Sequence, residues 1–89
     1  MIFEWDPIKA EQNLKKHGVD FVEAANVFSD PLSVTYSDPD HSITETRYII
    51  IGMSKRNRLL IVAHTDRNDR TRIISARETT RHERKLYES

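Results

Sequence analysis

The sequence predicts an α+β fold in which an antiparallel sheet of about four to five strands is accompanied by two N-terminal helices and one C-terminal helix. Three observations lead to this fold. Helix start and stop signals gather in the first third of the chain and at its C-terminal end. Strand-like segments follow one another in between. The turns that join these segments are short and polar, which favours antiparallel pairing of consecutive strands.

The N-terminal third begins with Met1 to Trp5, which alternates apolar and polar residues and predicts a short strand. Asp6-Pro7 is typical of a helix start, with Asp as the N-cap and Pro in the first turn. That helix is expected to end at His17-Gly18, where glycine suits the C-cap. Asp20 is expected to cap a second helix. Its apolar stripe has helical spacing and consists of Phe21, Ala24, Ala25 and Phe28.

The rest of the chain predicts a run of strands followed by a helix. The strands are expected at residues 32–36, 45–53, 59–65 and 71–77. The segment 59–65 is the most apolar, so it is expected to be central. Residues 78–87 predict a terminal helix whose first residue is the acidic Glu78.

Length and composition limit the class of protein. The chain has 89 residues, which predicts one domain (residues 1–89) with little stability to spare. It has no cysteine, which excludes a disulfide framework and a thiolate metal cluster. The N-terminus has no basic segment followed by a long apolar run, and the apolar stretches are too short to span a bilayer. We therefore expect a cytoplasmic protein that has no membrane partner.

The net charge of zero is a cancellation between the two halves of the sequence. Residues 1–46 hold three lysines against nine acidic residues, and residues 47–89 hold eleven basic against five acidic residues. Nine of those eleven basic residues are arginines, whose planar guanidinium groups suit phosphate oxygens. Such an asymmetry indicates either two well-solvated surfaces or a polyanionic or acidic partner.

Short motifs along almost the whole chain resemble a known family. The motifs are Phe3-Glu4-Trp5-Asp6-Pro7, Lys9, Asn13, Lys16-His17-Gly18-Val19, Phe21, Glu23-Ala24, Val27-Phe28, Asp30-Pro31, His41, Glu45, Arg47, Ile51-Gly52, Arg72-Ile73-Ile74-Ser75-Ala76-Arg77, Glu83-Arg84 and Tyr87. In this order and spacing they resemble the BrnT family of type II toxin–antitoxin toxins. One departure is the turn Asn68-Asp69-Arg70, where a glycine would be a common choice.

The resemblance implies a fold similar to that of RelE-like ribonuclease toxins and an activity that cleaves RNA and blocks translation. It also implies a cognate BrnA-like antitoxin with a ribbon-helix-helix DNA-binding part. That antitoxin would neutralise the toxin and repress their shared operon, so operator DNA would be reached only through the antitoxin. We expect no cofactor.

RNA cleavage without a metal needs a base for the 2′-hydroxyl proton, cations at the phosphate and an acid for the leaving oxygen. The absence of cysteine and the scattered carboxylates favour this metal-free chemistry. Arg77, at the end of the last predicted strand, is our first candidate for a phosphate clamp. The alternative is a surface arginine paired with Glu78 or Glu83.

Three further residues are candidates for catalysis. Glu45 and Arg47 are two residues apart, so both side chains should point to one face of the sheet. They form either a structural pair or an acid–base assembly. His41 is either a proton-transfer group or a solvated loop histidine. A metal site at Asp38, Asp40 and His41 matches no specific ligand spacing and is not favoured.

Other basic residues are candidates for contacts with the RNA backbone. Arg67, Arg70 and Arg72 surround one turn and would follow RNA phosphates or meet an acidic antitoxin segment. Lys16 is a further candidate phosphate ligand. His17 is interpreted as a residue of the helix end and His64 as a half-buried structural histidine.

The main alternative function is that of a non-catalytic protein, whose arginines only bind the antitoxin or help it to hold operator DNA. Both functions need the same basic face, so the sequence does not separate them. A neighbouring gene for a small ribbon-helix-helix protein would confirm the pair. The sequence therefore predicts a ribonuclease, with a regulatory interaction protein as the alternative.

Overall fold

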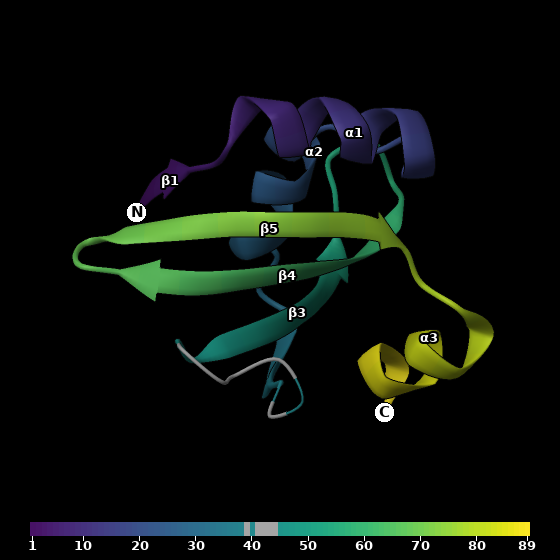
Figure 1. Ribbon diagram of the computed structural model, residues 1–89. Coiled ribbons are helices and arrows are strands. Elements are labelled where there is room, and N and C mark those ends of the chain that lie inside the picture. The colour runs from purple at the N-terminus through teal and green to yellow at the C-terminus, as the bar shows by residue number, and fades with distance from the viewer. Residues whose placement is uncertain (39, 41–44) are drawn as a thin grey trace.

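The computed structural model describes residues 1–38, 40 and 45–89 (Figure 1). Its elements are β1 (Ile2–Glu4), α1 (Pro7–His17), α2 (Phe21–Asn26), a short 3₁₀ helix η1 (Val27–Ser29), β2 (Val34–Ser37), β3 (Arg47–Met53), β4 (Leu59–Arg67), β5 (Arg70–Glu78) and α3 (Arg81–Glu88). This is the α+β arrangement that the sequence predicts. Within the described ranges, no helix is long and apolar enough to cross a membrane.

The five strands form one mixed sheet in the order β1-β5-β4-β3-β2. The strands from β2 to β5 pair antiparallel with their neighbours in sequence, and β4 lies in the centre, as expected. The exception is β1, which runs parallel to β5, with Phe3 opposite Thr71. No turn joins these two strands, so local sequence signals do not specify their pairing.

Both N-terminal helices begin where the sequence predicts, and α1 also ends at the predicted residue. The Asp6 side chain accepts a hydrogen bond from the backbone N–H of Ile8 (2.8 Å), and Gly18 ends α1 in the left-handed conformation (φ +70°). The Asp20 side chain accepts one from the backbone N–H of Glu23 (2.7 Å). The second helix is shorter than expected, because it ends at Asn26 and its last turn tightens into η1.

The last helix begins later than the sequence predicts, at Arg81 rather than at Glu78. Glu78 is not the first helical residue but the last residue of β5. The N-cap of α3 is Thr80, whose hydroxyl accepts from the backbone N–H of Glu83, while the Glu83 carboxylate accepts from the backbone N–H of Thr80. This reciprocal capping box starts the helix at Arg81 because it satisfies two backbone donors at once.

Strand boundaries also differ from those expected. The strand predicted at 45–53 begins only at Arg47, so Glu45 precedes it, and the strand predicted at 32–36 is shifted to 34–37. β4 and β5 extend further toward each other and leave a two-residue turn at Asn68 and Asp69. Asn68 has a positive φ of 56°, a conformation that asparagine tolerates better than most residues. The turn therefore does not require glycine.

The main core lies between the sheet and the two N-terminal helices. It contains Val19, Phe21, Ala24, Val27, Ile50, Leu60, Val62, Ile73 and Ala76. Trp5 packs at the rim of this core, with its ring centroid 5.9 Å from that of Phe21. Figure 1 shows α3 at the other side of the sheet from α1. There the Tyr87 hydroxyl donates to Asp30 (2.7 Å), whose carboxylate also accepts from the backbone of Met53.

His64 is buried in the core side of β4 and is only 6% exposed. Its ring lies between those of Phe28 and Tyr48, with centroid distances of 4.8 and 5.7 Å. Neither ring nitrogen has a hydrogen-bond partner among the described residues. Burial lowers the pKa of His64, so the neutral ring is the form that the core accepts. His64 is therefore structural, as expected, although it is more deeply buried than the sequence suggested.

This burial predicts a specific loss of stability in acid. The unfolded chain takes up a proton on His64 below about pH 6.5, whereas the folded chain resists it, so the free energy of unfolding should fall as the pH drops through this range. A His64→Phe variant keeps the ring packing and should lose less stability. Urea denaturation of both proteins at about pH 7.5 and about pH 5.5 measures the difference. Identical pH dependence in the two proteins would contradict this role of His64.

Candidate functional site

A hollow of about 330 Å³ lies where the second half of β5 meets the C-terminal end of α1. Its lining residues come from α1 and from the three middle strands: Lys16, His17, Ile49, Ile61, Ala63, Ser75, Ala76 and Arg77. The side chains of Ile49, Ala63 and Ser75 point to the same face, because these residues are paired across β3, β4 and β5. The hollow thus has an apolar floor on the sheet face opposite the main core, and a rim that carries basic groups.

Asn13 explains why the end of α1 lies over this edge of the sheet. β1 covers only residues 70–72 of β5, so the later part of that strand has no neighbouring strand at this edge, although β4 pairs with its other edge. The buried side-chain amide of Asn13 takes the place of the missing strand. The amide nitrogen donates to the carbonyl of Ala76 (2.8 Å), and the amide oxygen accepts from the N–H of Ala76 (3.0 Å). The same nitrogen also donates to the carbonyl of Val19 (2.9 Å). One turn further along α1, His17 is thereby held at the hollow.

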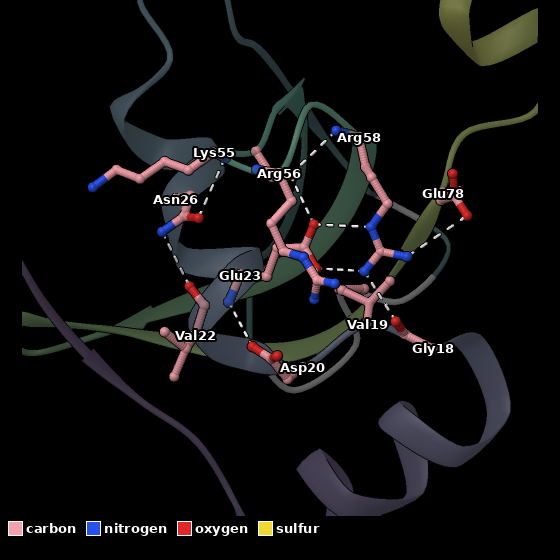
Figure 2. Close-up of polar contacts among 12 residues, drawn as sticks. Gly18, Val19, Asp20, Val22, Glu23, Asn26, Lys55, Arg56, Arg58 and Glu78 are labelled. Atoms are coloured by element: carbon pink, nitrogen blue, oxygen red, sulfur yellow. Dashed lines mark hydrogen bonds and ion pairs between the residues drawn. The ribbon is translucent and has the colours of Figure 1, made fainter.

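A buried ion pair holds the junction between α1 and α2 from the other side (Figure 2). Glu23 is 3% exposed and accepts hydrogen bonds from Arg58 and from the hydroxyl of Ser54 (2.7 Å). The hydrogen bonds from Arg58 lower the pKa of Glu23, although burial opposes this shift. Arg58 also donates to the carbonyl of Gly18 (2.9 Å), the residue that follows His17. This network fixes the position of His17, and no local sequence signal had indicated it.

Arg77 lines the hollow and also makes an ion pair with Glu83, which was the alternative prediction for this arginine. Its two terminal nitrogens donate to the two carboxylate oxygens of Glu83, at 2.7 and 2.8 Å. This pairing lowers the pKa of Glu83 to about 2, so the carboxylate is ionised and is a weak base at neutral pH. Glu78, the other expected partner, offers Arg77 its backbone carbonyl at 3.3 Å.

The structure divides the other predicted site residues between two ends of the open sheet face. Lys16 lies beside Arg77 at the hollow. Arg47 and Arg72 lie opposite Thr65, whereas Arg77 lies opposite Ile61. Those two positions on β4 are four residues apart, or about 13 Å at the rise of a strand. The predicted catalytic residues Arg47 and Arg77 are therefore not in one site.

The arginines at the far end are paired with carboxylates from the acidic half of the chain. Arg67 donates to both carboxylate oxygens of Glu45 (3.2 Å each), and these bonds lower the pKa of Glu45. Glu4 on β1 pairs with Arg72 at 2.8 Å and lies 3.8 Å from Arg70. The charge asymmetry of the sequence is thus partly cancelled inside the fold.

The described residues place at the hollow a histidine, His17, that is not among the predicted catalytic residues. His41 lies outside the described residues. His17, interpreted as a residue of the helix end, lines the hollow together with Lys16 and Arg77. Its spacing of four residues from Asn13 was the available signal, because residues at i and i+4 share one face of a helix. Among the residues that the structure describes, no group of three histidines or carboxylates is arranged to hold a metal ion.

Comparisons with known proteins identify the family and the fold. Residues 5–83 match the model of a family described as the ribonuclease toxin, BrnT, of type II toxin–antitoxin systems. The chain belongs to the BrnT family. The fold also matches the 1.1 Å crystal structure of the Brucella abortus ribonuclease toxin BrnT, with a TM-score of 0.66 and 21% sequence identity over 91% of this chain and 100% of that one. A search of curated proteins found no match. The BrnT resemblance is thus confirmed, whereas the likeness to RelE stays a prediction.

The role of Asn13 in this BrnT-family chain is testable by denaturation. An Asn13→Ala variant leaves buried backbone groups of Ala76 and Val19 without partners. We therefore expect it to lower the free energy of unfolding by about 1–3 kcal/mol. Gln12→Ala changes the exposed neighbouring residue and should stay within about 0.5 kcal/mol of the wild type. Urea unfolding of the three proteins measures both effects. Equal losses in both variants would show that the amide contacts do not hold α1 to β5.

Proposed function

We propose that this chain is an endoribonuclease that cleaves RNA without a metal ion and so blocks translation in the cytoplasm. The family match supports ribonuclease chemistry in general. The observation that carries the proposal for this chain is the set of Lys16, His17 and Arg77 around one hollow on an open sheet face. These three side chains supply cations for a phosphate and a proton-transfer group, which is what metal-free cleavage needs.

The proposed reaction uses the 2′-hydroxyl of the RNA as its nucleophile. The 2′-oxygen attacks the adjacent phosphorus, the bond from phosphorus to the 5′-oxygen breaks, and the products are a 2′,3′-cyclic phosphate and a 5′-hydroxyl. His17 accepts the 2′-hydroxyl proton, because a neutral imidazole is an effective base near neutral pH. Lys16 and Arg77 bind the phosphate oxygens as negative charge builds on them. The leaving 5′-oxygen takes up a proton, and His41 stays a prediction as a proton-transfer group.

The carboxylates near the open face are poorer candidates for the base. The pKa values of Glu83 and Glu45 are lowered by the arginines that pair with them, so both carboxylates hold protons weakly. We therefore propose that Glu83 orients Arg77 and that Glu45 orients Arg67. His17 makes no ion pair with a carboxylate among the described residues, so its ring nitrogens are available to a substrate.

The far end of the open face is proposed to bind RNA beyond the reacting phosphate. Arg47, Arg67, Arg70 and Arg72 belong to this end. The pair between Arg67 and Glu45 is partly exposed on both sides, and exposed pairs of this kind contribute little to stability. An RNA phosphate can replace the carboxylate at little cost. These arginines would then add affinity without taking part in bond cleavage.

The partner that we propose is a BrnA-like antitoxin with a ribbon-helix-helix part, which would bring operator DNA to the complex.

A non-catalytic role remains the second candidate function. The observation that favours it is the bidentate pair of Arg77 and Glu83, since a fully paired arginine is less available to a phosphate. Variants of this pair separate the two functions.

The first prediction concerns the metal. Purified protein incubated with RNA in excess chelator should cleave it at the same rate as without chelator, because protein side chains supply the charge and the proton transfer. Gel analysis of the RNA over time measures the rate. Cleavage that stops in chelator and returns when a divalent cation is added would contradict the metal-free mechanism.

The second prediction concerns Arg77 and its partner. Arg77→Ala should lower the cleavage rate by roughly two to three decades, because a charge-assisted contact to the transition state is lost. Glu83→Gln keeps the arginine and leaves an amide oxygen that can still accept a hydrogen bond from it, so it should retain most of the cleavage. Single-turnover rates, corrected for the folded fraction of each variant, measure both. Equal loss in the two variants would show that Arg77 serves only to hold α3.

A further inference from the structure

A second hollow of about 290 Å³ adjoins the first on the other side of the β5 edge. It is lined by Lys9, Gln12, Asn13, Lys16, His17, Ile74 and Ser75. Lys16, His17 and Ser75 line both hollows, so the two form one continuous groove from the open sheet face to the side of α1. We name this second part the α1 groove.

The floor of the α1 groove is closed to another strand. Asn13 already occupies the N–H and the carbonyl of Ala76, so a peptide strand cannot pair with β5 at this position. The pairing of β4 with β5 shifts beside it, because Ala63 lies opposite Ser75 whereas His64 lies opposite Ile73. Ile74 is the extra residue of this bulge and lines the groove. A ligand here must therefore bind side chains rather than extend the sheet.

Charge indicates what kind of ligand fits. Lys9, Gln12 and Lys16 are exposed and lie on one face of α1, and Lys9 and Lys16 are about 10 Å apart along the helix axis. Neither lysine makes an ion pair with any described residue. By contrast, Lys15 on the same helix pairs with Glu11 at 3.1 Å. The α1 groove thus offers two uncompensated positive charges beside the hollow.

We propose that the α1 groove binds the sugar–phosphate backbone of the RNA strand next to the cleaved nucleotide. Lys16 contacts the reacting phosphate and Lys9 contacts the next phosphate along the strand. Gln12 donates a hydrogen bond to a phosphate or sugar oxygen, and Ile74 packs against a sugar or base. This path rests on the proposed function, because it continues from the phosphate bound at His17 and Arg77. It adds affinity that is independent of sequence, since phosphates carry no base identity.

The decisive experiment measures binding, so that it does not depend on cleavage. The probe is a single-stranded oligonucleotide of about 12 nucleotides in which 2′-O-methyl groups prevent the reaction, titrated at several salt concentrations. Lys9→Ala should weaken binding about threefold and reduce the slope of log affinity against log salt by about 0.7. The matched control is Lys15→Ala on the same helix, which should leave both quantities at the wild-type value.

A cleavage experiment separates the α1 groove from the proposed active site. A dinucleotide fills only the first hollow, so Lys9→Ala should cleave it at the wild-type rate, whereas cleavage of a longer RNA should show a raised KM and an unchanged kcat. If the wild type cleaves neither substrate, the proposed function is contradicted. The binding experiment then still tests whether the α1 groove binds RNA. Wild-type affinity and salt slope in Lys9→Ala would overturn the α1 groove as an RNA site.

Discussion

The hydrogen bonds between the Asn13 amide and the backbone of Ala76 are the contact on which the rest of the structure depends. The first strand is too short to cover the whole edge of β5, and a buried backbone group without a partner is costly. A side-chain amide can donate and accept at once, so it replaces a strand at this point. As a result a helix, rather than a strand, borders the second half of β5.

This substitution decides where the chemistry is placed. A strand at the edge would extend the sheet, whereas the end of α1 brings Lys16 and His17 to the border of the open face. The pair of Glu23 and Arg58 completes the arrangement, because Arg58 binds the carbonyl of Gly18 at the junction of the two helices. The two contacts hold one short segment from opposite sides, which suits the catalytic role proposed for His17.

The distribution of charge follows the same pattern. Acidic residues of the first half, such as Glu4, Glu23 and Glu45, pair with arginines of the second half, so the asymmetry of the sequence becomes contacts between distant segments. Among the described residues, Lys16 at the hollow and Lys9 in the α1 groove make no ion pair, and both belong to the acidic half of the sequence. A charge count along the chain therefore does not locate these two positive charges.

Local signals predicted both ends of α1 and the start of α2, because Asp6, Gly18 and Asp20 act within a few residues of their own position. The antiparallel strands were also predictable, since short turns join them. The parallel pairing of β1 with β5 and the contact of Asn13 with Ala76 join segments more than sixty residues apart, so no local pattern specifies them. For the same reason His17 was interpreted only as part of a helix end.

The location of the RNA site on the folded chain is the central claim, and chemical-shift mapping tests it most directly. The labelled protein would be titrated with an uncleavable single-stranded oligonucleotide while the backbone amide signals are followed. Binding at the hollow and the α1 groove would shift the signals of residues 9–17 and 74–77. Shifts confined to residues 66–72 at the turn between β4 and β5, with residues 9–17 unchanged, would contradict it.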